Sequence, residues 1–206
     1  LAVVARYARD MEIIDQLATL YSPDLSQIDA ELRGNILMSK MIVDEANTFP
    51  YLLEKYQSES DPELLDDILG ALAAAKLDEN IATALRLLEQ PEIVRPQDHL
   101  FLYIYLLRNE KARPLALDWL YTHWGLVVSL SGEKSVEDYP RCTAGYITTR
   151  AEADRFYSFF DQHSDNPVLK RTLAMAKVSI ESRLHLTERE TSAVQTRIKQ
   201  LLEEMK

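Results

Sequence analysis

The chain has 206 residues and a net charge of −10, with 47% hydrophobic and 27% charged residues. That length can bury a sizeable core, and the composition is that of a globular protein. The acidic balance repels phosphate backbones, so we expect no nucleic-acid partner. The apolar runs are short and broken by polar residues, so we expect no membrane span. There are only 5 glycines, which favours helices over the glycine-rich turns of a β-protein.

Apolar residues recur at helical spacing from residue 10 onward, and short polar breaks separate the stretches. The Ser60-Asp61-Pro62-Glu63 break is a dense start signal, in which Ser60 can cap and Pro62 tolerates the first turn. The predicted helices cover residues 10–20, 28–41, 47–56, 64–72 and 78–88, and two more begin near Pro96 and Pro114.

The C-terminal third begins irregularly, since residues 129–148 contain Ser131-Gly132, Pro140 and Gly145. Beyond it, Thr149–Glu152 and Thr187–Glu190 both fit the capping box, so each predicts a helix start. Asn166-Pro167 predicts a third start, and the last helix is expected to end near Glu204.

These signals predict an all-α chain of about eleven helices with no strand, forming a single domain over residues 1–206. Helix-pair starts near residues 24, 61 and 96 give a spacing of about 35 residues, similar to HEAT or armadillo repeats. An irregular α-superhelix of such pairs and a closed bundle are both possible. We favour the superhelix, because short corners joining helices of similar length stack each helix pair on the next.

The segment RPQDHLFLYIYLLRN, residues 95–109, alternates aromatic and aliphatic residues as a β-strand would. We nevertheless predict a helix, because Pro96 suits a first helical turn and Asp98 complements the N-terminal dipole. Gln97 and Asp98 are then interpreted as polar groups that fix the helix entry and not as a reaction centre.

The sequence contains no recognisable catalytic or metal site. None of the four histidines belongs to an H-E-x-x-H pattern, and no two lie at metal-ligand spacing. Cys142, beside Arg141, could be a nucleophile only with a nearby base, so we interpret it as an ordinary semi-buried cysteine. Asp66-Asp67 is interpreted as part of a solvated helix face, and Trp119 with Trp124 as inter-helix packing on one helix.

Residues 92–127, EIVRPQDHLFLYIYLLRNEKARPLALDWLYTHWGLV, resemble the C-terminal helical, ER-aminopeptidase-like domain of the aminopeptidase N family of zinc metallo-aminopeptidases. ELRGNILMSK and TTRAEADRFYSFF resemble the family's domain entry and its threonine-capped helix. Two departures concern a corner and a cap: Glu110 stands where the family has glycine, and His123-Trp124 replaces an N-W pair. The matching residues are Val94, Gln97, Asp98, Asn109, Trp119 and Trp124, and the resemblance covers most of residues 24–204.

The resemblance implies a parent enzyme that removes N-terminal residues from peptides, with its zinc and general base in an upstream catalytic domain. The helical domain would cover the active site, wall the substrate chamber and gate peptide access. No catalytic or metal residue carries over, so we expect this chain alone to be inactive and to hold no cofactor. The expected partners are the catalytic domain of the same parent chain, met through an unusually apolar face, and peptide substrates.

Basic residues near the irregular segment, Arg141 and Arg150, are the candidate contacts for a peptide carboxylate in the chamber. The chain begins at Leu1 without a signal-peptide pattern and looks cut from a longer protein. The single cysteine is compatible with a reducing compartment, so we expect a cytoplasmic protein.

Two other classes of function remain open on the sequence. One is a free-standing helical repeat scaffold that binds a protein on its concave face. The other is an α-helical enzyme that uses Cys142, which is disfavoured because no base accompanies the thiol.

Overall fold

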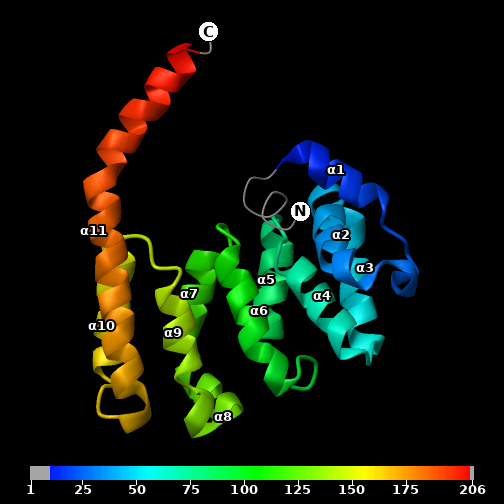
Figure 1. Ribbon diagram of the computed structural model, residues 1–206. Coiled ribbons are helices and arrows are strands. Elements are labelled where there is room, and N and C mark those ends of the chain that lie inside the picture. Colours follow the sequence, from blue (N-terminus) through cyan, green and yellow to red (C-terminus); the bar gives the residue numbers. More distant parts are fainter. Residues whose placement is uncertain (1–9, 205–206) are drawn as a thin grey trace. The chain divides into compact units, whose positions relative to one another are not determined.

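The computed structural model describes residues 10–204, which form eleven α-helices, one short 3-10 helix and no strand (Figure 1). The all-α class and the number of helices are therefore confirmed for the described residues. Contacts divide the chain into two compact units, one up to Leu130 and one from Ser131 onward. The superhelical stacking and the single domain over residues 1–206 stay predictions.

The first unit is a sequence of short helices, each packed on its neighbours. α1 packs on α2, α2 on α3 and α4, α4 on α6, and α6 on α7. Its elements are α1 (Met11–Thr19), η2 (Leu25–Gln27), α2 (Ala30–Val43), α3 (Glu45–Ser58), α4 (Pro62–Leu72), α5 (Asp78–Leu87), α6 (Pro96–Arg108), α7 (Arg113–Thr122) and the larger part of α8 (Trp124–Ser135).

Aspartate side chains start three of these helices. Asp10, Asp29 and Asp61 accept hydrogen bonds from backbone N–H groups in the first turns of α1, α2 and α4. Each carboxylate satisfies donors that have no partner inside the helix. The N-cap of α4 is thus Asp61 and not Ser60, because Pro62 at the first helical position fixes the residue before it as the cap.

The apolar stripes of these helices meet in a continuous core. Leu37 and Met41 of α2, Leu69 of α4 and Leu106 of α6 are fully buried. The helix predicted from Pro96 is confirmed as α6, with Tyr103 buried and Phe101 half exposed. The alternating aromatic residues therefore lie on different faces of one helix, one buried and one exposed, and this segment forms no strand.

The second unit is built around one long helix. α11 (Pro167–Glu204) packs on α9 (Asp138–Ala144) and on α10 (Arg150–Asp161). The capping box predicted at Thr149 is confirmed, because Thr149 and Glu152 each bond the other's backbone N–H. The predicted start at Asn166-Pro167 is also confirmed, with Asn166 accepting from the N–H of Val168.

Three local predictions are wrong. Residues predicted as irregular, 129–148, lie largely in α8 and α9, although Gly132 kinks α8 with a φ of 69° that favours glycine. Thr187 starts no helix, since its hydroxyl donates to the Arg183 carbonyl within an unbroken α11. Trp119 and Trp124 belong to separate helices, because α7 ends at Thr122.

The distal part of α11 exposes an apolar stripe. Figure 1 shows this helix continuing well past the beginning of α10. Val194, Ile198, Leu201 and Leu202 are 41–57% exposed there, at helical spacing. No helix within residues 10–204 is both long and apolar enough to cross a bilayer.

Candidate functional site

The predicted motif residues of α6 hold the beginning of that helix. Asp98 is nearly buried and accepts a 2.5 Å hydrogen bond from Nε of Arg95, the residue before the helix. This bond and the adjacent negative charge raise the pKa of the Arg95 guanidinium. Gln97 is exposed. Of the two predicted entry residues, Asp98 is therefore the one that ties the helix start to its preceding corner.

His99 joins α6 to the end of α5. Its ring is fully buried, and Nε2 forms a hydrogen bond with the carbonyl oxygen of Leu88. Burial lowers the pKa of His99, and the bond to Leu88 opposes that shift only in part. The imidazole therefore has a structural role, because it connects α6 to the end of α5 inside the core.

We expect stability to fall more steeply below pH 7 in the native chain than in a His99→Gln variant. The lowered pKa keeps folded His99 neutral where the unfolded chain, with a histidine pKa of about 6.5, binds a proton. The contribution of His99 to the free energy of unfolding is therefore fully present above pH 6.5. It is lost as the pH falls below that value, by at most about 1.4 kcal/mol per pH unit. Urea denaturation at several pH values from 7.5 to 5 measures the slope.

His185→Gln, which changes an exposed histidine, is the comparison variant and should alter that slope less than His99→Gln does. An unchanged slope in His99→Gln would show that other groups cause the acid sensitivity.

Asn109 connects two corners of the first unit. Its side-chain Nδ2 donates to the carbonyls of Ala73, at 2.9 Å, and Ala75, at 2.7 Å, in the turn after α4. Its Oδ1 accepts from the N–H groups of Lys111 and Ala112, just before α7. The side-chain amide of Asn109 therefore provides hydrogen-bond partners for backbone groups in two corners, which lie more than thirty residues apart in sequence.

Two further side chains secure the corner before α5. Glu45 accepts from the N–H groups of Lys76 and Leu77 and from the Asn80 amide, all within 3.0 Å. Lys111 donates to the Lys76 carbonyl and pairs with Asp78. A glutamate on α3 thus caps α5 from a distance, which no local capping pattern reveals.

Trp119 lies in an aromatic cluster on α7. The His123 ring stacks on it with centroids 5.2 Å apart, and His99 and Tyr103 approach it at 5.5 Å and 6.2 Å. Its indole Nε1 has no hydrogen-bond partner in the part of the chain that the structure describes. Trp119 is buried in this cluster on α7, and Trp124 is buried at the start of α8.

The two candidate arginines both lie beside carboxylates of the second unit. Arg141 forms an ion pair with Asp138 at 2.5 Å, and its side chain is 65% exposed. Arg150 donates to both oxygens of Glu181 and lies 3.4 Å from Glu188. Arg141 thus retains more access to solvent than Arg150, whose terminal nitrogens already contact two carboxylates.

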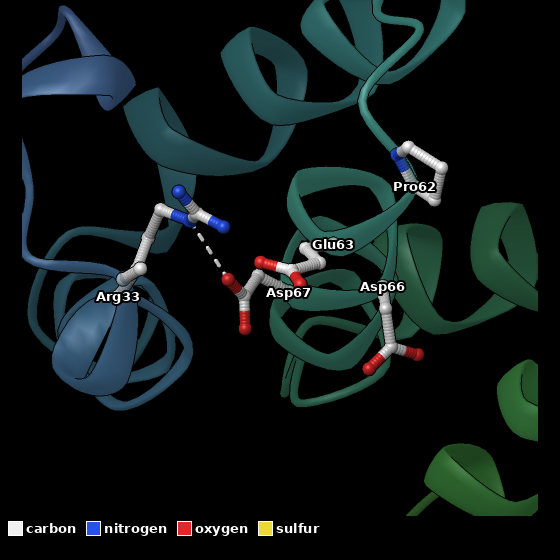
Figure 2. A pocket seen from close by; sticks show the side chains of 6 residues that line it. Arg33, Pro62, Glu63, Asp66 and Asp67 are labelled. Atoms are coloured by element: carbon white, nitrogen blue, oxygen red, sulfur yellow. Dashed lines mark hydrogen bonds and ion pairs between the residues drawn. The ribbon is translucent and has the colours of Figure 1, made fainter.

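A pocket of about 380 Å³ lies between α2 and α4, and Figure 2 shows its lining. Arg33 projects from α2 and donates from Nε to Asp67 of α4 at 2.7 Å. Asp66 projects away from Arg33 and accepts at 2.9 Å from the hydroxyl of Tyr105 on α6. The Asp66-Asp67 pair is therefore no simple solvated face, because both carboxylates join α4 to neighbouring helices.

Sequence reasoning missed the pocket, although one signal was available. Arg33 lies three and four residues before Ile36 and Leu37, so helical spacing places it on the buried face of α2. A buried arginine requires a charged partner. The partner, 34 residues away, could not be found from local pattern.

No group of three or more His, Cys, Asp or Glu side chains within residues 10–204 is arranged to hold a metal ion. Cys142 is half-buried and its thiol is not in a disulfide. The fold and these sites define an all-α protein whose described polar clusters chiefly connect its helices.

Comparison with known proteins identifies the family. Residues 1–182 match the model of the ERAP1-like C-terminal domain, and the chain belongs to that family. It is 27% identical to aminopeptidase N of Lactococcus lactis subsp. cremoris (strain MG1363) over 192 residues, which are 92% of this chain and 23% of that protein. It is also 27% identical to aminopeptidase N of Lactobacillus helveticus over 195 residues, 94% of this chain and 23% of that protein.

A more distant relative is glutamyl aminopeptidase of Mus musculus, which is 30% identical over 79 residues, covering 38% of this chain and 8% of that protein. The chain spans about a quarter of the length of the bacterial relatives that it matches. The resemblance to the C-terminal domain of the aminopeptidase N family is confirmed.

Proposed function

We propose that this chain is the non-catalytic C-terminal part of a zinc aminopeptidase that removes N-terminal residues from peptides. The family match carries the proposal, because it covers most of the chain while the chain covers only 23% of its bacterial relatives. The absence of H-E-x-x-H from the sequence supports a non-catalytic role. The zinc and the general base would then belong to the rest of the parent enzyme.

In this proposal the helical domain covers the active site of the parent, walls the peptide chamber and gates entry. We place the enzyme in the cytoplasm, in keeping with a single cysteine. The tightly bonded corners around Asn109 and Glu45 support this role, because a wall that moves as a body needs rigid connections between its helices.

The apolar stripe on distal α11 is the proposed contact with the rest of the parent chain. Val194, Ile198 and Leu201 would otherwise leave a contiguous apolar surface in water. The relatives are about four times longer than the matched region, so most of such a parent lies outside this chain. Ile198→Asp in the full-length enzyme should therefore weaken the attachment and expose α11 to limited proteolysis.

Arg141 is the better candidate of the two arginines for the carboxylate of a long peptide, because it is the more exposed. Such a peptide would compete with Asp138 for the guanidinium. Arg141→Ala in the full-length enzyme should raise KM for long peptides and leave KM for dipeptides unchanged. An unchanged KM for both would remove Arg141 from the proposal.

The proposal is tested by the activity of the chain alone and by the sequence that precedes Leu1. A homogeneous preparation with added zinc should not hydrolyse aminoacyl chromogenic substrates, and clear activity would contradict the proposal. The open reading frame upstream should encode H-E-x-x-H followed by a helical glutamate. A start codon close to Leu1 would favour the alternative of a free-standing repeat scaffold.

A further inference from the structure

We propose that Gly132 is a hinge at which α8 changes between a bent helix and a continuous one, and that this change reorients the second unit relative to the first. The chain passes from one compact unit to the other between Leu130 and Ser131. The hinge is therefore the second residue of the second unit. The inference rests on local backbone geometry and does not depend on the proposed function.

Gly132 is the residue at which α8 departs from helical geometry. Its φ of 69° and ψ of 165° lie in a region of backbone conformation that is essentially restricted to glycine. Glycine adopts negative φ about as readily as positive φ. The rest of α8, from Trp124 to Ser135, is helical on both sides of this residue. A change of the two backbone angles of Gly132 to helical values therefore makes α8 one continuous helix.

The chain is held on both sides of the hinge and loosely packed around it. Val127, which precedes the hinge, is fully buried. After the hinge, Val136 is buried, and Glu137 accepts a hydrogen bond of 2.6 Å from the Thr172 hydroxyl of α11. Residues 128–132 include no buried residue. The backbone around the hinge thus lacks the burial that would fix it in one conformation.

One side-chain contact favours the bent form. The Tyr139 hydroxyl of α9 and the side chain of Ser131 form a hydrogen bond, and this bond spans Gly132. Helical angles at Gly132 require φ and ψ to rotate by more than about 100° each. Because that rotation occurs one residue after Ser131, it displaces Tyr139 from its partner. The bond therefore acts as a latch that closes only in the bent form.

Double electron-electron resonance between spin labels in the two units tests the hinge. The labels are attached at Glu79→Cys of α5 and Ala174→Cys of α11, both exposed positions, in a Cys142→Ala background. The native hinge should give one major distance, that of the bent form. Gly132→Ala should raise the population of a second distance relative to the first at least about fivefold, because an L-residue is strained in the bent conformation.

Gly125→Ala is the matched control for Gly132→Ala. Both glycines lie in α8, and a methyl group added at either would meet no atom of the described residues within 4 Å. Of the two, only Gly132 has a positive φ. Gly125→Ala should therefore give the native distances, which excludes a general effect of helix propensity. An unchanged distribution in Gly132→Ala, or the same change in both variants, would overturn the hinge.

Ser131→Ala tests the latch and leaves the hinge residue in place, so the proposal stays testable if Gly132→Ala does not fold. The substitution removes the hydrogen bond to Tyr139 and should raise the population of the same second distance. Ser129→Ala changes an exposed serine of the same helix and should give the native distances. A native distribution in Ser131→Ala, or an equal change in Ser129→Ala, would contradict the proposal.

Discussion

Asn109→Ala should lower the free energy of unfolding of the chain by about 3 kcal/mol. The substitution removes two hydrogen bonds to the carbonyls of Ala73 and Ala75 and two from the N–H groups of Lys111 and Ala112. Ala73 and Ala75 are themselves buried, so their carbonyls would lose partners that water does not readily replace. Urea denaturation followed by circular dichroism measures the change.

Two variants show whether the amide itself is responsible. Asn47→Ala removes an exposed asparagine that donates only to Asp44, and it should cost well under 1 kcal/mol. Asn109→Asp retains an acceptor for Lys111 and Ala112 but loses the donor to the alanine carbonyls. It should therefore be nearly as destabilising as Asn109→Ala. Equal stability of Asn109→Ala and Asn47→Ala would exclude the connection between the two corners.

Trp119→Ala is expected to cost about 4 kcal/mol, because it empties the centre of a ring cluster in a buried seam. The indole is 95% buried, since 5% of the residue is exposed, and it contacts the rings of His99, Tyr103 and His123. The remaining cavity would lie between α6 and α7, which pack on each other within the first unit. The same denaturation experiment measures this loss.

Trp119→Phe separates ring packing from hydrogen bonding. Because the indole Nε1 has no partner among the described residues, its removal should cost no hydrogen bond. We therefore expect Trp119→Phe to lose less than half as much stability as Trp119→Ala. A loss as large as that of Trp119→Ala would indicate that Nε1 contributes an interaction of its own.

Helix content followed from local pattern because its causes are local. Pro96, Pro167 and the Thr149 capping box act within one turn, and each starts the helix that it predicts. The same reasoning failed at Thr187, where an equally good capping box lies inside α11. A threonine hydroxyl can bond a carbonyl four residues earlier as well as an N–H three residues later, so the local motif alone does not choose between them.

The connections between helices depended on partners far apart in the chain. Glu45 caps α5 across more than thirty residues, Asn109 joins two corners, and Arg33 pairs with Asp67. No rule based on residue spacing within a helix or turn predicts these pairings. Resemblance marked Asn109 as a motif residue, but only the tertiary structure shows which atoms it holds.

The sequence by itself determined the all-α class, the positions of most helices and the family, because hydrophobic periodicity, proline placement and ordered motifs are properties of the chain alone. The tertiary structure decided which polar side chains connect helices and which stay exposed to solvent. Burial and pairing are properties of neighbours brought together by folding. For that reason Asp66 and Asp67, which looked like a solvated pair, lie instead beside the buried Arg33 and the hydroxyl of Tyr105.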